Sequence, residues 1–299
     1  MSFLTEVKSE LCKIEASTCC KIAECYGILL MGRAFSANNM TILTESEDVV
    51  FRLSALLSRC FSTVPNISVG GSKKDLYRVS VGPKSKREEI LTSFGYFGFK
   101  EGDNPLKTYI FEDDCCRAAF LRGVFLSCAT VSDPNREYLA ELPVGNKELA
   151  NELFRFICDL GLTPKITARR KSYTIYFAGS ENLSDILAFI GAGSYALKLA
   201  DITVYKDVRN RLNRITNCET ANITKTVNAS VMQCLAIKKL KESGEFIRLS
   251  PELQRVGELR LVHDQASLTE LCELMDGEIT KSGLNHRLNR LVTLANNIK

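Results

Sequence analysis

The fold is decided by two copies of one pattern, CCKIAECYG at residues 19–27 and CCRAAFLRG at residues 115–123. In each copy a glycine follows eight residues after the first cysteine, and the copies are 96 residues apart. Farther along, IL-x-x-FG at residues 90–95 recurs as IL-x-x-IG at residues 186–191, at the same separation. Three anchors in the same order at one offset indicate an internal duplication.

Each half is predicted to contain a helix, two strands, a helix, two strands and a helix. The helical stretch 48–61 has its counterpart in 147–160. β-Branched and aromatic residues between Gly, Pro and Ser predict pairs of strands. These pairs are 66–69 with 76–81, and 165–167 with 173–177.

The two anchor helices, 23–31 and 118–127, are apolar on nearly every side, which predicts that both are buried. Each contains a glycine at its middle, Gly27 or Gly123, where glycine costs about 1 kcal/mol relative to alanine. Close approach of a neighbouring backbone explains such a glycine most simply. We therefore expect the two helices to cross at a pseudo-twofold axis.

The segments CYGILLMGR (25–33) and LRGVFLSCA (121–129) resemble degenerate LAGLIDADG helices of homing endonucleases. Together with SDP at 132–134, the anchor segments resemble the bacterial WhiA family. That resemblance implies an α+β protein, in which a duplicated LAGLIDADG-type α/β saddle domain precedes an all-α helix-turn-helix domain. The expected parts are a saddle at 1–200 with repeats at 19–95 and 115–191, a basic helical linker at 201–222, and a DNA-binding domain at 223–299 with its helix-turn-helix at 267–295.

Nuclease activity is not expected. The resemblance implies that, in the endonucleases, an acidic residue near the end of each central helix helps to hold the catalytic metals. In this sequence Gly32 and Cys128 occupy those positions. Glu24 and Asp133 lie nearby at different helical positions. We therefore expect a non-enzymatic binding scaffold, with residual metal-dependent endonuclease activity, or a protein-binding adaptor using the saddle, as alternatives.

Length and charge agree with this division. A chain of 299 residues with 45% hydrophobic and 25% charged residues is typical of about two globular domains. Its net charge of +4 is too small to indicate nucleic-acid binding by itself. Residues 201–299 contain fifteen bases and twelve acids, so +3 of the +4 lies in the last third.

Two hairpin connections at equivalent places of the repeats are basic, which suits contacts with DNA phosphates. The alternative is that they are solvated turns. The residues concerned are Lys73, Lys74, Arg169, Arg170 and Lys171.

The strongest functional signal lies at the C-terminal end. Ser267 and Glu270 form a capping-box pattern at the start of a helix, and Thr280 or Ser282 can cap the next. Residues 264–278 contain five acids and no Lys or Arg, whereas residues 281–299 contain four bases and no acid. A second helix with exposed basic and amide groups suits a major groove, and the alternative is an ordinary solvated face. The run KSGLNHRL at residues 281–288 also resembles the WhiA helix-turn-helix.

Roles are assigned within this helix and the linker. We expect bases to be read by Asn285, His286, Asn289 and Arg290, on a face that also carries Ser282. We expect phosphates to be bound by Lys281, Arg287, Arg209, Arg211 and Arg214.

Twelve cysteines in a chain without a signal-peptide pattern predict reduced thiols in a cytoplasm. Adjacent cysteines on a helix point about 100° apart and no C-x-x-C spacing occurs. The pairs at 19–20 and 115–116 are therefore expected to be small buried residues, with no metal and no cofactor. The expected partner is double-stranded DNA, at a promoter or in the nucleoid, with a further protein partner on the first domain and no membrane. The resemblance implies transcriptional regulation linked to sporulation, or to cell division and chromosome segregation.

Overall fold

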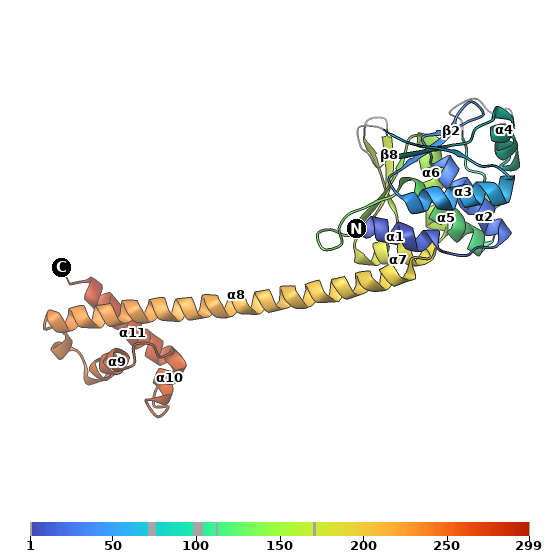
Figure 1. The fold of residues 1–299 in the computed structure, drawn as a ribbon. Helices are drawn as coiled ribbons and strands as arrows, with labels where there is room; N and C mark the ends of the chain where they lie inside the picture. Colours follow the sequence, from blue (N-terminus) through green and yellow to red (C-terminus); the bar gives the residue numbers. More distant parts are fainter. Residues whose placement is uncertain (1, 71–75, 98–103, 112, 170–171, 299) are drawn as a thin grey trace. The chain divides into compact units, whose positions relative to one another are not determined.

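A computed structural model describes residues 2–70, 76–97, 104–111, 113–169 and 172–298 of the chain. The chain (Figure 1) divides into two compact units, Met1–Lys206 and Asp207–Lys299. Each unit has an apolar core of its own. Within the described residues, no helix combines the length and the apolar character that a membrane span requires.

The N-terminal unit repeats one succession of elements after α1 (Phe3–Cys12). The first copy consists of α2 (Thr18–Leu30), β1 (Ala34–Phe35), β2 (Met40–Thr44), α3 (Glu47–Phe61), β3 (Asn66–Val69), β4 (Tyr77–Ser80) and α4 (Lys84–Ser93). After the short 3-10 helix η1 (Thr108–Ile110), the second consists of α5 (Asp114–Cys128), β5 (Thr130–Val131), β6 (Leu139–Val144), α6 (Lys147–Asp159), β7 (Lys165–Arg169), β8 (Ser172–Ala178) and α7 (Ser180–Ile190). The predicted duplication is thereby confirmed.

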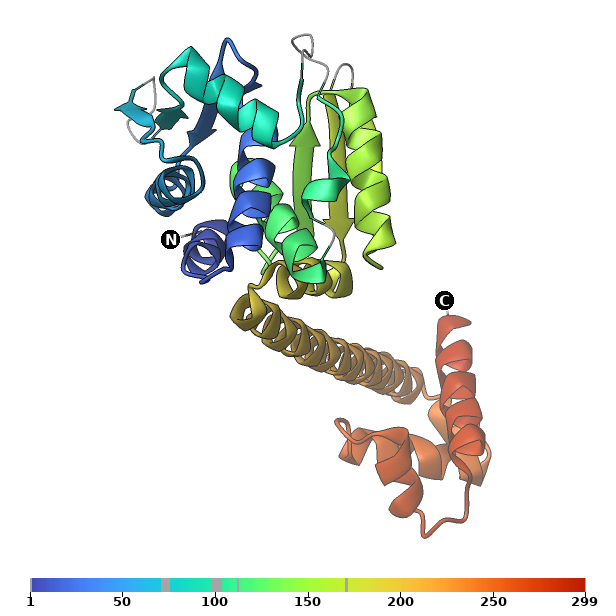
Figure 2. The same cartoon turned by 90° about the vertical axis from the view of Figure 1, so that its right-hand side faces the viewer.

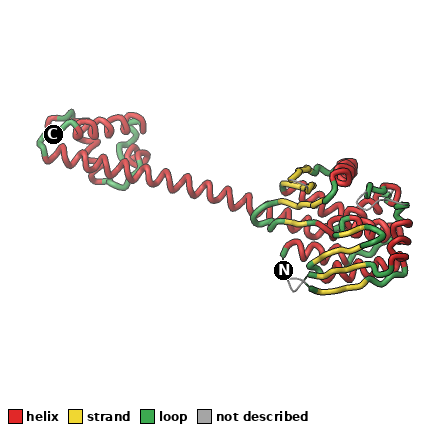
Figure 3. The backbone as a smooth tube through the Cα atoms, turned by 90° about the horizontal axis from the view of Figure 1, so that it is seen from above, coloured by secondary structure: helices red, strands yellow, loops and turns green. Residues whose placement is uncertain are grey.

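The two sheets have the same topology. Their strand orders are β1-β2-β4-β3 and β5-β6-β8-β7, and every pairing is antiparallel. Ile42 pairs with Val79 in the first sheet and Leu142 with Ile175 in the second, and all four side chains are buried. Each sheet (strands yellow in Figure 3) thus turns an apolar face toward the core.

The crossing of the two central helices, predicted from their glycines, is confirmed. α2 and α5 lie side by side in the N-terminal unit (Figure 2). A Cβ atom on Gly27 would collide with the carbonyl oxygen of Phe120, and one on Gly123 with that of Glu24. The backbones of the two helices therefore touch at both glycines, and neither position has room for a side chain.

The C-terminal unit is helical, as predicted. Its first helix belongs to α8 (Gly193–Glu242), a single helix that contains the boundary between the units. The expected linker at 201–222 and the start of the expected DNA-binding domain at 223 both lie within this one helix, because no Gly or Pro between residues 194 and 243 ends it. The remaining elements are η2 (Phe246–Arg248), α9 (Pro251–Val262), α10 (Leu268–Glu273) and α11 (Lys281–Asn296).

Candidate nucleic-acid interface

The start of α10 is fixed by the predicted capping box. The Ser267 side chain accepts a hydrogen bond from the Glu270 amide (3.3 Å), and Glu270 Oε2 accepts one from the Ser267 amide (2.7 Å). Hydrogen bonds with Ser267, mainly with its backbone and to a lesser extent with its side chain, hold the pKa of Glu270 below its usual range. The box thus satisfies two amide groups that the helix itself leaves free.

A left-handed turn connects α10 to α11. Asp276 and Gly277 have φ of 53° and 72°, and the Gly277 amide donates to the Cys272 carbonyl (3.2 Å). Thr280 then caps α11 by accepting a hydrogen bond from the Gly283 amide at 3.2 Å. Of the two candidate caps, Thr280 and Ser282, the structure selects Thr280.

α11 has one buried and one exposed face. The buried face contains Leu284, Leu288, Leu291 and Ala295, within the core that also holds residues of α9 and α10. The exposed face brings together six of the seven residues proposed on this helix: Lys281, Ser282, Asn285, His286, Asn289 and Arg290. Polar groups of these types can donate to and accept from base edges in a major groove.

Arg287 differs from its neighbours. Its side chain is 29% exposed, and Nη2 donates to Glu252 Oε2 of α9 at 2.9 Å. A second pair, Arg255 with Glu278 at 2.7 Å, joins α9 to the turn before α11. Arg287 therefore already has an anionic partner within the protein, which the spacing of residues in the sequence does not reveal.

The three arginines on α8 do not form one surface. All are exposed, as is every residue from 207 to 225. At about 100° per residue, Arg211 and Arg214 lie about 60° apart around the helix axis, whereas Arg209 lies well over 100° from both. One flat partner can therefore contact Arg211 and Arg214 together but not Arg209 with them.

The structure describes the two basic hairpins only in part. Lys73, Lys74, Arg170 and Lys171 lie outside the described residues, and of Arg169 only the backbone is described, in register with Ser172. The candidate phosphate contacts of the saddle therefore remain predictions.

The two positions at which the resemblance to homing endonucleases implies acidic residues carry no carboxylate. Gly32 follows the end of α2, and a Cβ there would meet the Thr41 carbonyl oxygen at 2.8 Å. Cys128 is the last residue of α5, where its Sγ donates to the Val124 carbonyl (3.4 Å) and burial raises its pKa to about 12. A protonated, hydrogen-bonded thiol and a glycine cannot replace the oxygen ligands that magnesium prefers.

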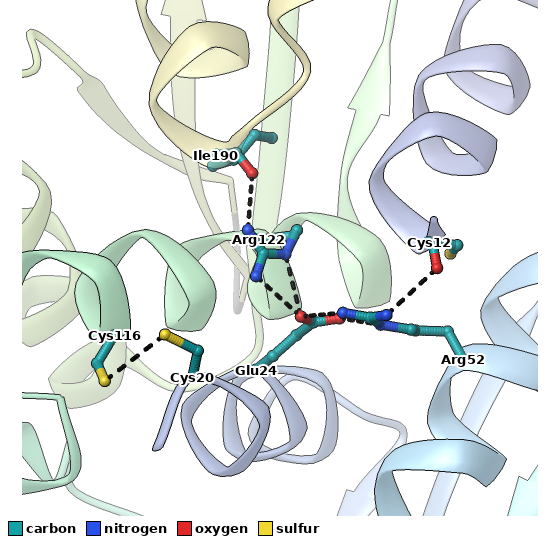
Figure 4. Close-up of polar contacts among 7 residues, drawn as sticks. All are labelled: Cys12, Cys20, Glu24, Arg52, Cys116, Arg122 and Ile190. Carbon is teal, nitrogen blue, oxygen red and sulfur yellow. Dashed lines mark hydrogen bonds and ion pairs between the residues drawn. The ribbon is translucent and has the colours of Figure 1, made fainter. Parts of the chain in front are cut away.

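Neither nearby acid compensates. Asp133 is exposed and accepts hydrogen bonds from the Asn135 amide and side chain, which lower its pKa. Glu24 is fully buried and bound to two arginines, Arg52 and Arg122 (Figure 4). This cluster was not predicted from the sequence, where its signal was one acid and one base on the otherwise apolar stretches 23–31 and 118–127.

A second group of polar side chains lies where the N-terminal ends of α2 and α5 meet. The Sγ atoms of Cys19, Cys20, Cys115 and Cys116 all lie within 4.8 Å of one another. The expectation that both pairs would be buried is wrong for Cys19 and Cys115, which are exposed because they lie in the first helical turns. A hydrogen bond with Ser17 lowers the pKa of Cys19, whereas one with Cys20 raises that of Cys115.

Comparisons with known proteins point to one family. The model of the WhiA LAGLIDADG-like domain matches residues 117–209, and that of the WhiA C-terminal HTH domain matches residues 212–295. The chain is 35% identical to a "Probable cell division protein WhiA" of Ruminiclostridium cellulolyticum, with 100% of this chain and 98% of the relative covered. The protein of the same name from Clostridium novyi is also 35% identical, with 100% and 99% covered.

Solved structures show the same fold. The full-length DUF199/WhiA protein of Thermatoga maritima is similar with a TM-score of 0.60 at 23% identity, and the match covers 100% of this chain and 99% of that one. The N-terminal LAGLIDADG domain of DUF199/WhiA matches with a TM-score of 0.50 at 21% identity, over 64% of this chain and 92% of that domain.

Proposed function

Because the chain belongs to the WhiA family, we propose that it is a sequence-specific, non-enzymatic protein that binds double-stranded DNA and regulates transcription. The observation that carries this proposal is the exposed polar face of α11, held on a helix-turn-helix whose opposite face is buried. The curated relatives are named probable cell division proteins. Cell division, chromosome segregation or sporulation are accordingly the processes that we propose it serves, from the cytoplasm and at the nucleoid.

The roles on α11 follow from side-chain chemistry. Asn289 and Asn285 can bond an adenine edge, and Arg290 a guanine edge, while His286 lies on the same exposed face. For Lys281, which is exposed at the N-terminal end of the helix, we propose a phosphate contact. Arg287 would have to exchange Glu252 for a phosphate, so we give it a smaller share of the binding energy.

Binding-site selection followed by gel shifts tests the base contacts. Substituting His286, Asn289 and Arg290 each by alanine should weaken binding to the selected site by about 1–3 kcal/mol per lost base contact, with less effect on unrelated DNA. Asn296→Ala, an exposed position at the far end of the same helix, is the matched control. Unchanged affinity of all three variants for the selected site would refute the assignment.

The absence of nuclease activity is a separate proposal, supported by Gly32 and Cys128 at the former acidic positions. Supercoiled plasmid incubated with the protein and Mg²⁺ or Mn²⁺ should stay intact. Nicking that co-purifies with the wild type and disappears in an Asp133→Asn variant, at an exposed acid, would instead establish residual endonuclease activity.

A further inference from the structure

The four thiols at the N-terminal ends of α2 and α5 come from both halves of the duplicated unit. Cys20 Sγ lies 3.9 Å from Cys116 Sγ, across the two helices (Figure 4), and Cys115 Sγ lies 4.0 Å from Cys116 Sγ. All four sulfur atoms lie within 4.8 Å of one another, and no other group of three or more His, Cys, Asp or Glu side chains in the described part of the chain is so arranged. Neither DNA binding nor the packing of the helices requires this grouping.

These separations fit a metal better than a disulfide. A tetrahedral site with Zn–S bonds of about 2.3 Å places its sulfur atoms about 3.8 Å apart. A disulfide requires about 2.05 Å between two sulfur atoms and leaves the other pair unused. The separations of 3.9 Å and 4.0 Å lie close to the edge of this tetrahedron, and all the others are at most 4.8 Å.

The surroundings favour thiolates once a cation is present. Four thiolates so close together repel one another, and a divalent cation removes most of that repulsion. The first turns of α2 and α5 contribute the positive ends of two helices, and neither helix has a side-chain cap at its start. Lys21 follows the first cysteine pair and Arg117 the second, where Arg117 also pairs with Asp114 at 3.3 Å. The Ser17 hydroxyl lies 3.1 Å from Cys19 Sγ.

Access is also suitable. Cys19 and Cys115 are exposed, whereas Cys20 and Cys116 are buried. A cation can therefore enter from solvent and become enclosed by protein on its inner side. Since four protein sulfurs fill a tetrahedral shell, no position remains for a substrate or a reactive water, as in structural zinc sites.

We propose that Cys19, Cys20, Cys115 and Cys116 bind one thiophilic divalent cation, Zn²⁺, in a closed structural site that fastens the two central helices together. The metal would join the first repeat to the second at the ends where α2 and α5 begin. This inference does not depend on DNA binding, so either can fail alone.

Co²⁺ is the probe for the first experiment, because a tetrahedral tetrathiolate gives cobalt intense visible and near-ultraviolet absorption. The reduced, metal-free full-length chain should develop this spectrum at one equivalent of Co²⁺ and lose it on addition of Zn²⁺. Cys19→Ser/Cys115→Ser replaces the exposed pair, which limits harm to folding, and Cys20→Ser/Cys116→Ser replaces the buried pair. Both should lose the spectrum, whereas the control Cys158→Ser/Cys218→Ser, at exposed thiols elsewhere, should retain it.

Thermal unfolding gives a second readout. Zn²⁺ should raise the unfolding temperature of the wild type and the control, but not that of the variant lacking Cys19 and Cys115. The proposal is overturned if the reduced wild type gives no tetrathiolate spectrum, if cluster and control variants respond alike, or if the thiols are found paired as disulfides and the reduced chain takes up no metal.

Discussion

The carboxylate of Glu24 and the guanidinium of Arg122 form an ion pair between the two halves of the duplicated unit. Arg122 Nε and Nη2 each lie 3.0 Å from Glu24 Oε2, and Arg122 Nη1 donates to the Ile190 carbonyl at 3.1 Å. Arg52 of α3 completes the cluster, with Nε and Nη2 at 2.7 and 2.8 Å from the carboxylate. Glu24 is fully buried and the Arg122 side chain is 7% exposed, so each charge depends on its partners for solvation.

Glu24→Gln should therefore destabilise the N-terminal unit strongly. It removes one charge and leaves two guanidinium groups with little exposure, a change that costs about 3–5 kcal/mol in buried pairs. Urea unfolding followed by circular dichroism measures the loss. The control is Glu88→Gln, whose partner Lys84 is 63% exposed, and it should change the free energy of unfolding by less than about 1 kcal/mol. Equal effects of the two substitutions would contradict the structural role of the cluster.

Gly123→Ala tests the crossing of the central helices. The added methyl group would overlap the Glu24 carbonyl oxygen, a backbone atom that cannot move away without separating α2 from α5. We expect the free energy of unfolding to fall by about 1–3 kcal/mol. Gly193→Ala is the matched control, since it lies at the start of α8 with no atom within 4 Å, and it should be neutral or stabilising. A stable Gly123→Ala protein would mean that the helices cross elsewhere.

Much of the fold could be predicted because its signals are local or repeated. The offset of 96 residues predicted the duplication, Gly27 and Gly123 predicted the contact between helices, and Ser267 with Glu270 predicted the start of α10. The first signal is a repeat, and the other two depend on backbone requirements that few residue types satisfy.

The candidate sites were less predictable because they depend on contacts between residues far apart in the chain. Glu24 and Arg122 are 98 residues apart, and Arg287 is 35 residues from Glu252. Their pairing depends on which helix faces meet, which no local pattern encodes. Likewise, the two cysteines of each pair point about 100° apart on their helix, and neither pair has a spacing typical of metal binding. The crossing of α2 and α5 nevertheless brings all four thiols together.

The proposed division between phosphate and base contacts predicts different responses to salt. Lys281→Gln should reduce affinity for selected and unrelated DNA alike, and it should lower the slope of log K against log salt by about 0.9 if one phosphate contact is lost. Asn289→Ala should weaken binding to the selected site while leaving that slope unchanged. Fluorescence anisotropy at several salt concentrations measures both quantities. The assignment fails if Lys281→Gln leaves the slope as it is, or if Asn289→Ala lowers it.

The capping box predicts how the stability of the helix-turn-helix depends on pH. The Ser267 amide donates to the Glu270 carboxylate, which holds the pKa of Glu270 below its usual range in the folded state. The Glu270 carboxylate therefore makes its full contribution to the free energy of unfolding above the ordinary glutamate pKa of about 4.3. This contribution is lost as the pH falls through the lower pKa of the folded state. Glu270→Ala should lower the unfolding temperature of the C-terminal unit at neutral pH, and the difference from wild type should shrink in acid.

The matched control for this prediction is Glu273→Ala, which removes an exposed carboxylate from the same helix without altering the cap. Circular dichroism melts of all three proteins across the acidic range give the comparison. The control should stay close to the wild type throughout, because Glu273 accepts no bond from Ser267. A difference for Glu270→Ala that stays constant down to the lowest pH would show that the substitution acts through helix propensity instead of through the hydrogen-bonded carboxylate.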